Sequence, residues 1–169
     1  MDTTLMGWTP EALTLGAGLL VVRLVVGLYM VAHGAQKFGW FGGYDLAATG
    51  GFFDALGFRP GKLFAATAGV TEIVSGLLVT FGLLGPVGPA LMLSVLIVAA
   101  VSVHWANGMF ATTNGIEHAT VFAAAAAALA LTGPGVLSLD AWMGLQRLWM
   151  PDIAWTALAV GIGGGIANL

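Results

Sequence analysis

The chain has 169 residues, of which 59% are hydrophobic and only 8% are charged, and its mean hydropathy is +0.96. Soluble domains carry about 25% charged residues, so this composition excludes an ordinary soluble globule. The formal net charge is −3 without any basic run, which argues against nucleic acid as a partner, and the absence of cysteine excludes disulfides, thiolate metal sites and iron–sulfur clusters.

Four apolar segments are long enough to cross a hydrocarbon core, which needs roughly 20 residues. We expect these spans at about residues 13–36, 62–84, 87–105 and 116–132. The pattern predicts an all-α membrane protein, with residues 1–169 forming a single polytopic membrane domain around a four-transmembrane-helix bundle. Membrane lipid is therefore an expected partner.

The first span is expected to begin behind a Thr9 cap with Pro10 in its first turn, since proline suits that position. Residues 38–61 follow, rich in glycine and aromatic rings. Asp45 is placed to cap a short helix there, and the rings suit the headgroup level. We therefore predict an interfacial helix in this first loop.

The fourth span contains an alanine run, residues 123–128, which predicts a close packing face because small side chains let helices approach in lipid. Residues 138–169 form a C-terminal extension. Ser138 could cap an amphipathic helix over residues 139–149, lying in the interface. Residues 153–167 are apolar but short, so they predict either a short fifth span or an interfacial or partner-packed segment.

Two charged residues lie inside predicted spans. Arg23 and Glu72 each stand about ten residues into a span, and an isolated charge at the bilayer centre costs at least ~2.5–3.5 kcal/mol. Antiparallel neighbours at matching depth would let them pair, so we predict a buried Arg23–Glu72 ion pair. It would serve either the fold alone or, through Glu72, a proton relay or a ligand.

All three histidines fall at one membrane face, because alternating spans bring the end of the first, the end of the third and the start of the fourth together. These are His33, His104 and His118. Lys37 shares a helix face with His33, and Tyr29 joins them one turn back. Adjacent residues cannot both face inward, so at most one of Glu117 and His118 does.

Several sites could use these histidines. A metal site is not predicted, because the i, i+4 double-histidine or Glu-x-x-His spacing is missing, and a bis-histidine haem has no specific support. A quinone pocket fits better, since a quinone needs an apolar slot, one or two hydrogen-bond donors and a proton exchanger. The competing interpretation is that the histidines only cap helix ends. Rings available at this end are Tyr29, Phe38, Trp40, Phe41, Trp105 and Phe110.

The segment Arg23-Leu-Val-Val-Gly27, the run His33-Gly-Ala-Gln-Lys37 and Glu72 ahead of Ser75-Gly76 together resemble the DoxX family. So do Gly133-Pro134-Gly135 and the Ser138-Leu-Asp140 that follows. The likeness covers about residues 19–141. It implies a four-helix membrane protein, with Arg23, His33, Lys37 and Glu72 as family-typical positions.

Relatives in that family include DoxD-type subunits linked to thiosulfate:quinone oxidoreduction. The missing cysteines argue against carrying thiosulfate over to this chain as its substrate. The resemblance and the residues together predict a small integral subunit of a quinone-linked redox or electron-transport system, with candidate catalytic residues Arg23, Glu72, His33 and Lys37. The candidate quinone site is His33, Tyr29, His104 and His118. The alternative is a non-catalytic accessory subunit of a larger membrane complex. Both need protein partners, because the sequence shows no redox centre of its own.

Lysine and arginine in short loops predict orientation. Lys37, Arg59 and Lys62 flank the first loop, whereas Arg147 stands alone at the opposite end. This bias predicts that the histidine-side loops are cytoplasmic, in a prokaryotic cytoplasmic membrane.

Overall fold

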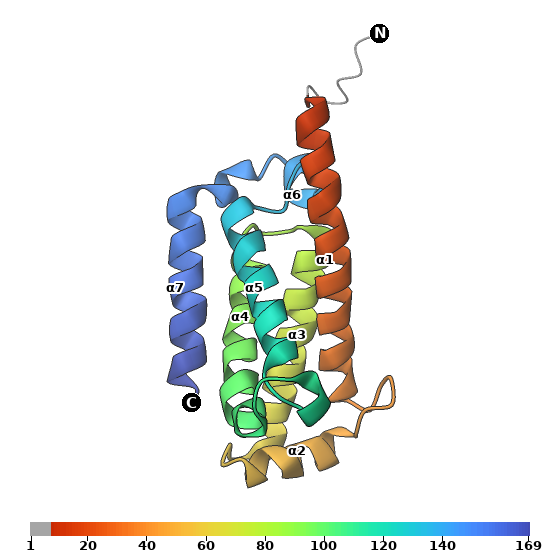
Figure 1. Cartoon of the computed structure of the whole chain (residues 1–169), viewed down its shortest axis with the longest axis vertical. Coiled ribbons are helices and arrows are strands. Elements are labelled where there is room, and N and C mark those ends of the chain that lie inside the picture. Colours follow the sequence, from red (N-terminus) through yellow and green to blue (C-terminus); the bar gives the residue numbers. More distant parts are fainter. Residues whose placement is uncertain (1–7) are drawn as a thin grey trace.

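The computed structural model describes residues 8–169, and all regular structure in that part of the chain is helical. Long helices run up and down, and the short helix α2 lies across one end (Figure 1). The helices are α1 (Pro10–Gln36), α2 (Leu46–Ala55), α3 (Gly61–Phe81), α4 (Val87–Ala99), α5 (Glu117–Thr132), α6 (Leu139–Trp142) and α7 (Pro151–Ala167). Short π and 3₁₀ turns, η2 (Ala100–His104) and η3 (Trp105–Asn107), extend α4.

Three helical stretches are long and apolar enough to cross a membrane: Pro10–Gln36, Gly61–Phe81 and Val87–Asn107. They correspond to the first three predicted spans. The chain is thus an integral membrane protein whose helices contact lipid. The fourth predicted span is α5, a shorter apolar helix of 16 residues, and the C-terminal tail forms α7, another apolar helix of 17 residues.

Local capping rules set the starts of several helices. The Thr9 hydroxyl accepts a hydrogen bond from the backbone N–H of Ala12, and Pro10 stands in the first turn of α1. The Asp45 carboxylate accepts from Ala48 N–H at the start of α2. These contacts satisfy backbone N–H groups that have no partner within a helix, and both predicted caps are confirmed.

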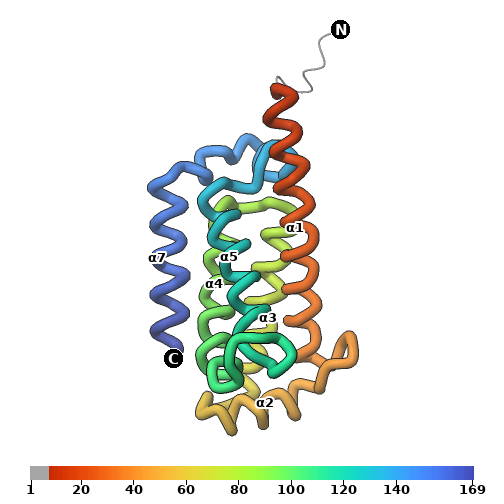
Figure 2. Tube along the Cα trace, viewed as in Figure 1, coloured from red at the N-terminus to blue at the C-terminus, as the bar shows by residue number. Residues whose placement is uncertain are grey.

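The core lies between α1, α3, α4 and α5, with α2 closing one end (Figure 2). α1 and α3 approach closely because glycines face each other: a Cβ on Gly76 would come within 2.6 Å of the Gly27 carbonyl oxygen. The predicted alanine face is confirmed, since Ala126 is fully buried in this core.

The predicted amphipathic helix over residues 139–149 is wrong. Ser138 does cap a helix, but α6 ends after one turn at Trp142, and a separate 3₁₀ turn, η5 (Gln146–Trp149), follows. Gly144 between them has a φ of +73°, which breaks the helix. Asp140, expected on a polar outer face, is fully buried.

α7 packs along the outer side of α4 and brings the C-terminus back to the α2 end of the bundle (Figure 1). Gly161 and Gly165 face α4, and a Cβ on Gly165 would lie 2.9 Å from the Ser94 carbonyl oxygen. A glycine-lined face gives close helix packing in lipid and offsets the weak helix propensity of these residues.

Candidate functional site

One cavity of about 240 Å³ lies among the helices at the α2 end of the bundle. Its polar lining residues are His33, Lys37, Glu72, His104 and His118, which come from α1, α3, η2 and α5. The remaining wall is apolar and includes Phe52 and Phe53 of α2 and Phe122 of α5. We call this space the histidine cavity. Three segments far apart in sequence therefore bring all three histidines of the chain to one space, and α3 adds Glu72.

The buried charge at this cavity is an ion pair between Lys37 and Glu72. The Lys37 Nζ lies 2.5 Å from Glu72 Oε2, and the side chains are 20% and 8% exposed. Lys37 is the C-cap residue directly after α1, and from there its side chain reaches Glu72 in the middle of α3. The lysine supplies both a counter-charge and a hydrogen bond, which a buried carboxylate requires.

The predicted Arg23–Glu72 pair is therefore wrong. The glycine contacts set the register of the two helices: Gly34 lies against Gly69, and Gly27 lies against Gly76 and Thr80. At that register Arg23 reaches Gly82, roughly 15 Å along the helix axis from Glu72. The reason is that the first turns of α3 extend past the end of α1 to pack on α2.

The histidines differ in their surroundings. His33 and His118 are exposed at the rim of the cavity, whereas His104 is half-buried. The His33 ring meets Phe122 edge to face, with the ring centres 6.3 Å apart. His104 Nδ1 lies 2.8 Å from the Asn114 carbonyl oxygen. Because a carbonyl can only accept, Nδ1–H is the donor, which leaves Nε2 of a neutral His104 as an acceptor.

The position of His104 depends on a π-helical turn. Residues Ala100–His104 form η2, at the point where α4 would otherwise continue as an α-helix. Single π turns inside helices are frequent at functional sites. Val103 and His104 of this turn both line the cavity.

Glu117 and His118, adjacent at the start of α5, point to different neighbours. The Glu117 carboxylate accepts a hydrogen bond from Ala111 N–H at 2.7 Å and so holds the preceding loop. His118 lines the histidine cavity. This agrees with the expectation that only one of the two can face inward.

Some predicted contributors lie elsewhere. Tyr29 is 61% exposed and touches Phe122 at its edge, but it does not line the cavity. Of the expected rings, Trp40, Phe41, Trp105 and Phe110 are all exposed outside it. The rings that do line it are Phe52, Phe53 and Phe122. Phe53 could have been found from the interfacial helix, because the inner face of that helix must cover the end of the bundle. Its neighbour Phe52 is 49% exposed and carries no such signal.

Within residues 8–169, no group of three or more histidine, aspartate or glutamate side chains is close enough to hold a metal ion. The three histidines share a cavity without forming such a cluster. Hydrogen bonding and proton exchange with a ligand are the chemistry that they can offer.

A second polar cluster lies at the opposite end, where residues 133–150 cover the turn between α3 and α4. We call this segment the lid. Asp140 of the lid is fully buried and accepts hydrogen bonds from Leu84 N–H, Gly85 N–H and the Trp149 indole. Arg23 donates to the Leu137 carbonyl oxygen of the same segment. Arg23 therefore belongs to the lid and not to the histidine cavity.

Comparison with known proteins gives one family match. Residues 18–105 match the family described as DoxX, a stretch covering just over half of the 169-residue chain. The match includes α1 with Arg23, His33 and Lys37, and α3 with Glu72, and it ends at Trp105, before α5. No curated protein and no solved structure matches. The chain belongs to the DoxX family.

Proposed function

We propose that this DoxX-family protein is a small integral subunit of a quinone-linked redox system, and that the histidine cavity is its quinone and proton site. The observation that supports the proposal is the meeting of three histidines and a buried Lys37–Glu72 pair in one otherwise apolar space. An apolar slot with a few convergent polar groups is the usual form of a small-molecule site.

The cavity size fits a ring and not a whole lipid-soluble quinone. Its volume of about 240 Å³ lies just below the ~300–1,000 Å³ of typical ligand pockets. The ring would enter and the isoprenoid tail would stay among the lipid chains outside. The rim between α1 and α5, where His33 meets Phe122, is the side from which a membrane-soluble ring would enter.

Reduction of a quinone to a quinol consumes two electrons and two protons. In this proposal the electrons come from a partner protein that carries a redox centre. Histidine changes its protonation near neutral pH, so His33 and His118 would donate hydrogen bonds to the quinone oxygens and exchange protons with them. His104, whose Nδ1–H is held by the Asn114 carbonyl oxygen, would accept a hydrogen bond from a quinol hydroxyl through Nε2. Glu72 and Lys37, which lie deeper in the bundle, would pass protons to or from the three histidines.

We further propose four membrane spans: α1, α3, the α4–η3 helix and α5. At 1.5 Å per residue α5 is about 24 Å long, which is short of a ~30 Å hydrocarbon core but close enough for a bundle to accommodate. The proposal keeps the histidine end on the cytoplasmic side of a prokaryotic membrane, because Lys37, Arg59 and Lys62 lie at that end.

Quinone binding to the purified protein tests the site. The unmodified protein is expected to bind a short-tailed ubiquinone analogue. The double variant His33→Ala/His104→Ala is expected to bind it at least about tenfold more weakly, a loss of about 1.4 kcal/mol. Tyr29→Phe is the matched control, since this ring lies outside the cavity. Equal binding by the double variant would remove the proposal.

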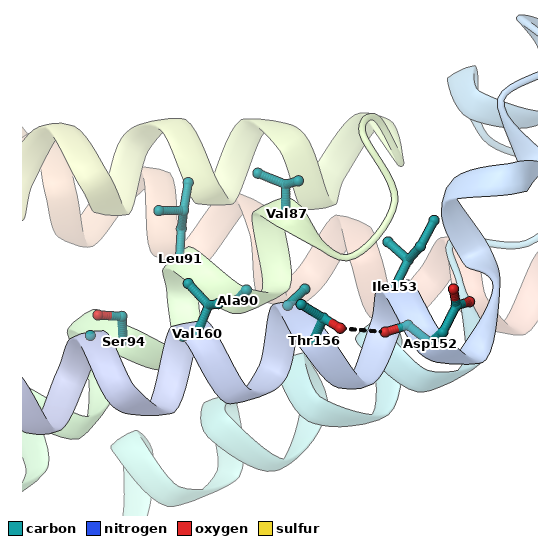
Figure 3. A pocket seen from close by; sticks show the side chains of 11 residues that line it. Val87, Ala90, Leu91, Ser94, Asp152, Ile153, Thr156 and Val160 are labelled. Atoms are coloured by element: carbon teal, nitrogen blue, oxygen red, sulfur yellow. Dashed lines mark hydrogen bonds between the residues drawn. The ribbon is translucent and has the colours of Figure 1, made fainter.

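The second candidate function is an accessory subunit that packs against a larger membrane complex without chemistry of its own. An outward-facing groove of about 540 Å³ between α4 and α7 favours it; Figure 3 shows the apolar side chains of Val87, Leu91 and Val160 around it. Because the chain has no cysteine, a single cysteine at Leu91 gives an unambiguous crosslinking site. A crosslinked partner whose activity survives the double histidine variant would favour this function over the first.

A further inference from the structure

Arg23 is a buried cation whose hydrogen bonds are incomplete within the described chain. It is only 1% exposed, and one of its terminal nitrogens donates to the Leu137 carbonyl oxygen. Among residues 8–169, its Nε and Nη1 and the nearby Thr80 hydroxyl have no hydrogen-bond partner. Buried polar groups are almost always paired, so three such atoms together point to an acceptor that comes from outside the protein.

Asp140 does not supply that acceptor. Its carboxylate oxygens accept from two backbone N–H groups and the Trp149 indole, and no hydrogen bond joins either oxygen to Arg23. The aspartate therefore balances the charge of Arg23 from a distance and leaves its N–H groups free.

Arg23 and Thr80 both border an open groove of about 580 Å³ on the outside of the bundle. Apart from Ser138 the other walls are apolar, and they include Leu20 and Leu24 of α1, Phe81 of α3 and Trp142 of α6. The groove lies where α3 ends and the lid begins, and the Trp142 ring is 71% exposed beside it. Exposed tryptophan marks the headgroup level of a membrane protein.

We propose that this groove binds one membrane phospholipid, with its phosphate on Arg23 and Thr80 and an acyl chain along Leu20, Leu24 and Phe81. Phosphate oxygens are strong acceptors for guanidinium N–H groups, and the threonine hydroxyl can donate a further bond. The apolar walls match an acyl chain, a feature that a free phosphate would not use. This site is at the opposite end from the histidine cavity and does not depend on the proposed quinone function.

Lipid binding to delipidated protein in detergent tests the site with three probes. Dioleoyl phosphatidylglycerol carries both phosphate and chains, dioleoylglycerol carries the chains alone, and glycerol 3-phosphate carries the phosphate alone. Only the first is expected to raise the thermal unfolding midpoint and to appear as one bound molecule by native mass spectrometry, since a ligand of the folded state stabilises it by mass action.

Thr80→Val and Arg23→Lys are expected to weaken phosphatidylglycerol binding at least tenfold. Thr120→Val is the matched control, because this exposed hydroxyl lies on α5 and bonds only its own helix. Equal stabilisation by dioleoylglycerol, or by glycerol 3-phosphate, would overturn a phospholipid site. So would unchanged affinity in Thr80→Val, which decides the matter even where Arg23→Lys fails to fold.

Discussion

The two ends of the bundle bury a carboxylate in different ways. Asp140 at the lid end has both oxygens occupied by N–H groups of its own chain, two of them on the backbone of the α3–α4 turn. Glu72 at the cavity end has one side-chain partner, Lys37, and borders an open space. A carboxylate that is held by hydrogen bonds from two backbone N–H groups and an indole fixes the fold, whereas one with a single side-chain partner that borders a cavity can act on a ligand.

The largest effect is expected from Asp140→Ala. It removes the acceptor of three hydrogen bonds, one of them fully buried, together with the negative charge nearest the buried Arg23, and leaving a buried charge uncompensated costs about 3–5 kcal/mol. Denaturant unfolding in micelles measures the loss. The control is Asp152→Ala, an exposed position on α7 where a change within about 0.5 kcal/mol is expected. Equal effects of the two would contradict a structural role for the lid cluster.

Gly82→Ala probes the lid end from its other side. Gly82 has a φ of +61°, and a Cβ there would meet the Arg23 guanidinium. We expect a loss of about 1–3 kcal/mol from the left-handed backbone, with an added part from displaced Arg23. Gly42→Ala is the matched control, because Gly42 also has a positive φ, +77°, but open space around it. The same unfolding assay should give a smaller loss of unfolding free energy for Gly42→Ala than for Gly82→Ala. The reverse order would mean that the Arg23 side chain can move aside without cost.

A double-mutant cycle separates the two clusters. Lys37→Met and Glu72→Gln share a contact, so their combined effect on stability should depart from additivity by about 0.5–3 kcal/mol. Arg23→Gln and Glu72→Gln are expected to be additive, because roughly 15 Å of helix separates them. Thermal or denaturant unfolding of the single and double variants measures both couplings. A strong Arg23–Glu72 coupling would reject the helix register described above.

The smallest stability effect is expected from His33→Ala. His33 is exposed at the cavity rim, so the change in unfolding free energy should stay within about 0.5 kcal/mol. The same variant is expected to weaken quinone binding, measured by titration with the short-tailed analogue. A large loss of unfolding free energy with unchanged quinone binding would mean that His33 stabilises the fold and does not contact the ligand.

The sequence predicted well what depends on neighbours in the chain. Thr9, Asp45 and Ser138 act as caps because a side-chain oxygen needs only the next turn of its own helix. The common end of the three histidines was also predictable, since alternation of spans requires no knowledge of packing. That His33, His104 and His118 line one cavity is a further result of the packed structure.

The failures concern long-range packing. Depth counted from the ends of apolar runs paired Arg23 with Glu72, but glycine contacts between α1 and α3 set a different register. Periodicity placed Asp140 on a polar outer face, whereas its carboxylate turns inward to hydrogen-bond a turn some 55 residues earlier in the chain. Neither contact leaves a signal in a local pattern.

The π turn at Ala100–His104 makes the position of His104 sensitive to the deletion of a single residue. A π turn holds one residue more than the α-helical path, so every residue after it is rotated by about 100° around the helix axis. Removing a single residue here would restore an α-helix and carry the His104 ring away from its neighbours while leaving span length and hydropathy nearly unchanged. Between related chains, a one-residue gap at this point would therefore separate those that keep a histidine on this wall from those that have lost it.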